Sequence, residues 1–153
     1  MHLAIVSPFP PTITGIGQYG YHVTRAIANT GTFSRVTVLA GAKADSGNCP
    51  NHLGNTELDY CWQPSQLKAG QAILSRLKRL NPDLVWFNLG ASVFGKSPFL
   101  NLSGMFTPML TRRMGLFAVG AFVEFQPGDT VSGIALLIGD DADAPVTLVP
   151  ARM

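Results

Sequence analysis

A glycine pattern near the N-terminus is the first group of residues with a known chemical use. Gly15, Gly17 and Gly20 form G-x-G-x-x-G, a spacing that brings the backbone close to the pyrophosphate of a dinucleotide. In that use the first glycine directly follows a strand, and an acidic residue ends the next strand. Here eight residues separate the glycines from the preceding apolar run, and the nearest acid after the second run is Asp45. The spacing argues against NAD(P) or FAD. It leaves a turn without a ligand, or a helix N-terminus that faces a ligand cleft and favours phosphate.

A second pattern, G-x-x-x-x-G-K-[ST], occurs at residues 90–97, GASVFGKS. It is the pattern of P-loop NTPases, in which Lys96 would reach the terminal phosphates and Ser97 would bind magnesium. The loop interior holds a bulky valine and phenylalanine, however, and Pro98 removes an N–H where the following helix should donate one. The alternative interpretation is an ordinary loop with a surface lysine and a helix-capping serine.

Cys49, His52 and Cys61 are the side chains whose types suit a metal ion. The Cys49-x-x-His52 spacing is short enough for zinc, but a fourth ligand is missing. The remaining histidines, His2 and His22, have no neighbouring Asp or Cys that would indicate a catalytic triad, and no G-x-S-x-G is present. We therefore expect no metal and no catalytic residue in this chain.

Composition and charge exclude some classes of protein for this chain. Its 153 residues suffice for one domain, and 46% are hydrophobic and 13% charged. A net charge of +2 does not indicate nucleic acid, and no apolar run reaches the ~20 residues of a membrane span. Residues 1–116 hold ten basic and four acidic side chains, whereas residues 117–153 hold one and five. Without a basic n-region at the start, we expect a cytoplasmic protein.

Strand and helix patterns alternate along the chain. Continuous apolar runs predict buried strands, and an alternating run predicts an edge strand. The buried runs are 2–6, 35–40, 83–87 and 116–125, and the edge run is 57–63. Three helices are expected: Gly15 to a C-cap at Gly31, a capping Ser65 to Leu80, and 97–114 with breaks at two prolines. The alternation predicts an α/β fold with a Rossmann-like, doubly wound, mostly parallel sheet.

The last part of the chain has a different pattern. Residues 126–129, Gln-Pro-Gly-Asp, are a strong turn signal between two β-rich runs, and no amphipathic helix follows. We therefore expect a β-hairpin-like C-terminal tail whose outer strand is antiparallel. The expected division is a Rossmann-like domain at 1–125 and an atypical tail at 126–153.

One stretch, "AIVSPFPPTITGIGQYGYHVTRAIANTG", leads from a first strand through a proline-rich loop into a Gly-Ile-Gly helix start. "FSRVTVLAG", "NPDLVWFNLGASVFGKS" and "LTRRMGL" follow it. With these pieces, residues 1–116 resemble the N-terminal domain of family 4 glycosyltransferases, which are retaining enzymes of the GT-B fold. The resemblance favours a helix start at a sugar-transfer cleft and makes the G-x-G-x-x-G match incidental.

The resemblance implies a substrate-binding role for five residues and no catalytic residue. Gly15, Ile16 and Gly17 match the family's glycine loop near the donor diphosphate, and Asn88 and Gly90 follow a strand that opens onto the same edge. The family transfers sugar from a nucleotide-sugar co-substrate and usually needs no metal or other cofactor. Its C-terminal domain binds the donor and carries a Glu-x7-Glu motif. The implied partners are that missing domain and a sugar or lipid-linked acceptor, at a cytoplasmic site peripheral to the inner membrane.

The chain also departs from the family. The strand LFAVGAFVEF lacks the histidine that the family often places after an RRMGL-like segment, and beyond Gln126 nothing resembles the family. We therefore expect that the chain is a truncated or frame-shifted product, or that it has a genuine alternative ending. In either case we expect it to be inactive alone. Two other functions stay open: a P-loop NTPase that uses GASVFGKS, and a non-catalytic α/β binding module.

Overall fold

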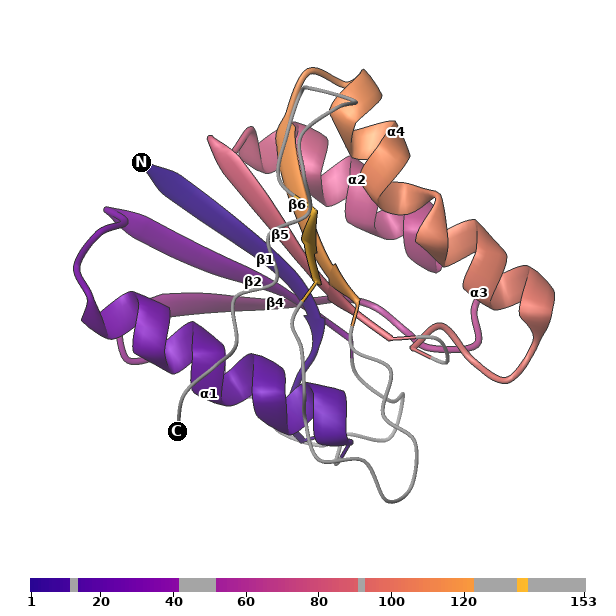
Figure 1. The fold of residues 1–153 in the computed structure, drawn as a ribbon, viewed down its shortest axis with the longest axis horizontal. Helices are drawn as coiled ribbons and strands as arrows, with labels where there is room; N and C mark the ends of the chain where they lie inside the picture. Colours follow the sequence, from indigo (N-terminus) through magenta and orange to yellow (C-terminus); the bar gives the residue numbers. More distant parts are fainter. Residues whose placement is uncertain (12–13, 42–51, 91–92, 123–134, 138–153) are drawn as a thin grey trace.

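The computed structural model describes residues 1–11, 14–41, 52–90, 93–122 and 135–137 (Figure 1). The strands are β1 (His2–Pro8), β2 (Arg35–Gly41), β3 (His52–Leu53), β4 (Thr56–Trp62), β5 (Leu84–Leu89), β6 (Phe117–Phe122) and β7 (Ala135–Leu137). The helices are α1 (Gly15–Asn29), α2 (Ala69–Leu80), α3 (Pro98–Met105) and α4 (Thr107–Arg113). The expected α/β class is confirmed.

The strands form one sheet in the order β3-β4-β2-β1-β5-β6-β7. The five strands from β4 to β6 are parallel, and the two outer strands of the described sheet, β3 and β7, pair antiparallel with their neighbours. From β1 the chain first proceeds toward β4, then returns to place β5 on the other side of β1. This reversal confirms the doubly wound, mostly parallel sheet.

Helices lie on both faces of the sheet. Figure 1 shows α1 on one face, and α2, α3 and α4 on the other. Because successive strand residues point to opposite faces, β1 supplies both cores. Leu3 and Ile5 belong to the core under α1, and Ala4 and Val6 belong to the core under α2. All four are at most 2% exposed, as expected for a central strand of a parallel sheet.

Three expectations about individual elements were wrong: the place of one strand in the sheet, the start of one helix and the end of another strand. The run expected as an edge strand, β4, lies between β2 and the two-residue β3. Ser65 does not cap α2, since it has a φ of 69° and α2 begins four residues later, after an N-cap Lys68 whose side chain makes no cap bond. β1 extends beyond the apolar run, because Ser7 and Pro8 continue the pairing with β2. The connection to α1 is therefore shorter than the sequence indicated.

Other expectations are confirmed. Gly31 has a φ of 67° just beyond the C-cap of α1, where a residue without a Cβ is favoured. The segment expected as a broken helix forms α3 and α4, each with a proline in its first turn. β7 pairs antiparallel with β6, as the hairpin-like tail requires. The predicted turn at 126–129 lies outside the described residues, and the domain boundary there stays a prediction.

Candidate functional site

The carboxyl ends of β1 and β5 are the place in this fold where a ligand is expected. The two strands are neighbours and parallel, but the chain leaves them in opposite directions across the sheet. In open α/β sheets this divergence leaves a crevice outside the strand ends, where ligands bind. α1 begins at this edge, because it follows β1 and contacts both β1 and β5.

A hydrogen-bond network joins α1 to these two strands. The Nδ2 of Asn88, on β5, donates to Ser7 Oγ on β1 over 2.9 Å and to the carbonyl of Ile16 in the first turn of α1 over 3.2 Å. Ser7 Oγ in turn donates to the carbonyl of Pro8 over 2.7 Å. Ser7 and Asn88 are fully buried. The network therefore fixes where the N-terminus of α1 lies relative to the strand ends.

Gly20 lets the helix approach this closely. A Cβ on Gly20 would lie 2.3 Å from Ser7 Oγ and 2.9 Å from Asn88 Nδ2. Both distances are too short for any side chain, so the close approach of α1 to β1 and β5 requires glycine here. This is the role of the third glycine in G-x-G-x-x-G, which serves helix–strand packing. Sequence reasoning placed Gly20 in the glycine pattern but assigned neither Gly20 nor Ser7 to the site, although the spacing of the third glycine was a usable signal.

The first turn of α1 presents backbone N–H groups. Thr14 is the N-cap, and its Oγ1 accepts from the N–H of Gly17 over 3.0 Å. Among the described residues, the N–H groups of Gly15 and Ile16 have no acceptor, as is usual for helix starts. Gly15 is exposed, and a Cβ on it would meet no described atom within 4 Å. A helix start of this kind favours an anion.

Asn88 carries an unused acceptor beside this turn. Its Nδ2 makes both donations described above, and the carbonyl of Ile16 can only accept, which fixes the orientation of the amide. The Oδ1 atom is buried and has no hydrogen-bond partner among the described residues. Because buried amide oxygens are normally paired, Asn88 Oδ1 is a buried acceptor to which the described residues supply no donor.

The five residues named from the sequence are only partly brought together. Ile16 and Asn88 are bonded to one another, and Gly15 and Gly17 lie in the same helical turn. Gly90 follows β5 and is buried, and its carbonyl accepts from the N–H of Val93 over 3.2 Å, but no described contact joins it to α1. The structure thus assembles four of the five residues at the strand ends.

The site offers binding groups more than proton-transfer groups. Neither a carboxylate nor an imidazole belongs to the described network of hydroxyl, amide and backbone groups. Burial raises the pKa of the Tyr19 phenol, which is partly buried on α1, so that side chain stays neutral at physiological pH. The arrangement can donate N–H groups to an anion.

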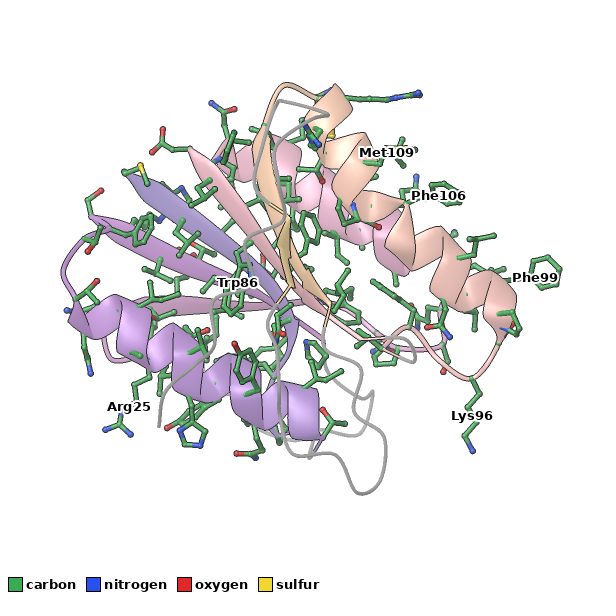
Figure 2. All side chains as sticks on the ribbon, in the orientation of Figure 1. Arg25, Trp86, Lys96, Phe99, Phe106 and Met109 are labelled. Atoms are coloured by element: carbon green, nitrogen blue, oxygen red, sulfur yellow. The ribbon has the colours of Figure 1, made fainter. Side chains whose placement is uncertain are left out.

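The P-loop candidate has a different architecture. Of its eight residues, 91–92 lie outside the described residues. Phe94 is 2% exposed, and its ring centroid lies 5.3 Å from that of Trp62 in the core. The N–H of Phe94 donates to the Asn101 side chain, so it is not free for a phosphate. Lys96 is exposed and extends away from the molecule (Figure 2). These features favour a structural loop, in which Ser97 makes no side-chain cap bond.

The metal candidate gains no support from the described residues. Cys49 lies outside them, His52 is exposed on β3, and Cys61 is a free cysteine, partly buried on β4. No group of three or more His, Cys, Asp or Glu side chains that could hold a metal ion occurs in the described parts of the chain.

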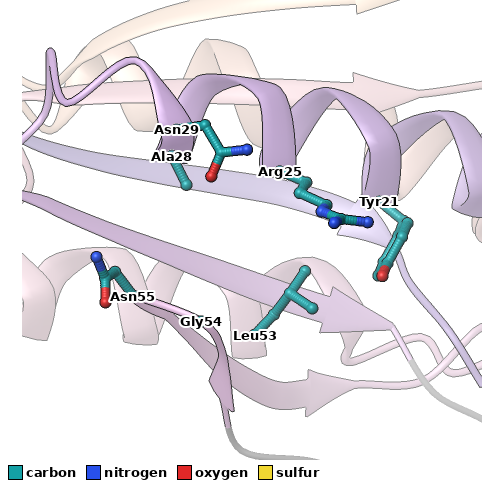
Figure 3. Close-up of a pocket in the computed structure, with 7 residues that line it drawn as sticks. All are labelled: Tyr21, Arg25, Ala28, Asn29, Leu53, Gly54 and Asn55. Atoms are coloured by element: carbon teal, nitrogen blue, oxygen red, sulfur yellow. The ribbon is translucent and has the colours of Figure 1, made fainter.

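A separate pocket of about 440 Å³ lies between α1 and the β3–β4 turn at the side of the sheet (Figure 3). Four residues of α1, including Arg25, line one side, and Leu53 to Asn55 from β3 and the turn before β4 line the other. Arg25, Asn29 and Asn55 are exposed, so the pocket is a shallow surface hollow. Asn55 precedes β4, so this end of the pocket is near the amino ends of the parallel strands, whereas Tyr21 at the other end packs against Phe9, with ring centroids 5.9 Å apart.

No family model matches the chain, and a search of curated proteins found no match. Over the residues that the structure describes, no helix combines the length and the apolar character needed to cross a membrane.

Proposed function

We propose that this chain is the acceptor-side domain of a nucleotide-sugar-dependent glycosyltransferase, either as a fragment or as one half of a two-chain enzyme. The observation that carries the proposal is the contact of Gly20 with Ser7 and Asn88. This contact holds a glycine-rich helix start against the carboxyl ends of β1 and β5. The sequence resemblance to family 4 enzymes supports the same function.

The proposed role of the site is electrostatic. The N–H groups of Gly15 and Ile16 would face the diphosphate of a donor that a second domain holds, and would stabilise the negative charge that develops as it departs. Asn88 would act indirectly, because its Nδ2 bonds to Ser7 and to the carbonyl of Ile16 hold the first turn of α1 in place. The donor nucleotide sugar is a co-substrate, and the acceptor is a sugar or a lipid-linked molecule. The proposed location is the cytoplasm, at the surface of the inner membrane.

A titration of the ¹⁵N-labelled chain with inorganic pyrophosphate tests the site. We expect the amide signals of Gly15 and Ile16 to shift, and Gly15→Pro to weaken binding. Proline at this first helical position removes one N–H and keeps the helix, and Thr14 already has the extended backbone that precedes proline readily. Gln18→Ala, which changes an exposed side chain of the same helix, is the matched control and should bind as the wild type does.

Three outcomes would contradict the proposal. Amide shifts that centre on residues 93–97 and are abolished by Lys96→Ala would favour a P-loop. Absence of any shift at the start of α1 would show that this helix start does not bind pyrophosphate. Sugar transfer by the 153-residue chain alone would contradict the proposed division between two domains, because the proposal assigns donor binding to a second domain.

A further inference from the structure

α3 and α4 carry a row of large apolar side chains on their outer side. Phe99 is 79% exposed and Phe106 is 45% exposed, and Figure 2 shows both rings and Met109 directed away from the sheet. We call this row the α3–α4 apolar stripe. Its members are the exposed residues Phe99, Leu102, Phe106, Met109, Leu110 and Met114. At about 100° per residue they fall within an arc of about 140° on nearly continuous helix.

The inward side of the same helices carries one large apolar residue, the partly buried Leu100, and is otherwise small and polar where it is described. Thr107 and Thr111 are buried, at 1% and 0% exposure, and Thr111 Oγ1 donates to the carbonyl of Thr107 over 2.8 Å. Gly104 is buried against the ring of Phe94. A surface helix normally turns its apolar side to the core and its polar side to water. Here the large apolar residues of the stripe face outward, so the stripe does not serve the core of this domain.

The charge around the stripe is of one sign. From residue 84 to residue 123 the chain contains no Asp or Glu and three basic residues. Lys96, just before α3, and Arg113, in the last turn of α4, are exposed. Basic groups therefore stand near both ends of the stripe. A second copy of the chain is disfavoured as the partner, because a symmetric contact would bring these like charges together.

We propose that the α3–α4 apolar stripe binds the surface of a bilayer that contains anionic lipids. Short helices with aromatic and aliphatic residues on one side and nearby cations lie in the plane of such a surface. Their apolar side enters the boundary between headgroups and acyl chains. Lys96 and Arg113 would contact lipid phosphates at the two ends. The inference extends the proposed location of the protein, yet it stands on the helices alone and does not depend on sugar transfer.

Flotation of the full 153-residue chain with vesicles tests the inference. We expect binding to phosphatidylcholine vesicles that contain phosphatidylglycerol, and weaker binding to phosphatidylcholine alone or in high salt. Arg113→Glu should weaken binding by about fivefold or more, from the contribution of one cation near an anionic surface. Its matched control is Arg25→Glu on α1, on the other face of the sheet, which should change binding by less than about twofold (Figure 2).

The apolar part is tested by Phe99→Ser with Phe106→Ser. Both rings are exposed, so the double variant should keep the wild-type thermal midpoint and lose binding by about tenfold or more. Binding that is equal for the wild type and this variant would overturn the proposal. Absence of binding of the wild-type chain to vesicles that contain phosphatidylglycerol would also overturn the proposal. In that event sedimentation velocity would distinguish a stripe that joins two copies from one that binds another protein.

Discussion

Replacing Gly20 with alanine is the sharpest test of how α1 is held at the strand ends. The new Cβ would lie 2.3 Å from Ser7 Oγ and 2.9 Å from Asn88 Nδ2, and both side chains are fully buried. Overpacking of this kind costs about 1–3 kcal/mol, and breaking the Ser7–Asn88 bond inside the core costs about 1–3 kcal/mol more. Alanine is about 1 kcal/mol more favourable than glycine within a helix, which offsets part of the loss.

The expected net effect of Gly20→Ala is a loss of about 2 kcal/mol or more in the free energy of unfolding. Urea denaturation followed by tryptophan fluorescence measures it, because Trp62 and Trp86 lie on the two faces of the sheet. Gly15→Ala is the matched control in the same helix. A Cβ there meets nothing within 4 Å, so its stability should equal or exceed that of the wild type.

A second substitution separates the clash from a general effect on the helix. In the Gly20→Ala background, Ser7→Ala removes the closest atom and leaves the Ser7 Cβ at 3.3 Å from the new methyl group. A double-mutant cycle should therefore show that the two substitutions together cost less than the sum of their separate effects. Equal stabilities of Gly20→Ala and Gly15→Ala, with no coupling to Ser7, would refute the reasoning.

Two further predictions concern titratable groups outside the site. Burial, and then the charge of Arg35, lower the pKa of His2, so below about pH 6.5 the unfolded chain binds more protons than the folded one and stability falls. His2→Gln should make the free energy of unfolding less dependent on pH below about pH 6.5. A pH profile of stability that is unchanged by this substitution would show that protonation of His2 does not contribute to it. Burial, and then the charge of Asp59, raise the pKa of Cys61 to about 12. Peptide-level mass spectrometry should show alkylation of Cys61 about a thousandfold slower in the folded chain than in urea, and comparable rates would contradict this burial.

The strand pattern was predictable because buried parallel strands read as continuous apolar runs. β1 and β5 show this directly, since both of their faces are covered. Local signals failed where distant contacts decide the backbone. Ser65 looked like a helix cap, but its N–H donates to the carbonyl of Phe94, and its φ is positive. That bond joins residues far apart in the sequence, which no local rule includes.

The site could be predicted in its position and not in its construction. The rule that ligands bind at the carboxyl ends of strands led to Asn88, and the helix start led to Ile16. The contact of Gly20 with Ser7 depends on how closely α1 lies on β1, which periodicity does not reveal. The unpaired Oδ1 of Asn88 is also invisible in the sequence, because it depends on which atoms the neighbouring groups leave unbonded.

The central place of β1 has a consequence for synthesis on the ribosome. β1 and β2 can pair early, but β5 supplies the other neighbour of β1, and Ser7 and Asn88 are 81 residues apart. At about 5–20 residues per second, that stretch takes about 4–16 s to emerge. Throughout this interval the β5-facing edge of β1 lacks its native partner, while its apolar side chains are only partly covered. Thus β1, the central strand of the sheet, has the longest delay before both of its neighbours have been synthesised. During this delay we expect the nascent chain to be most prone to mispairing at β1.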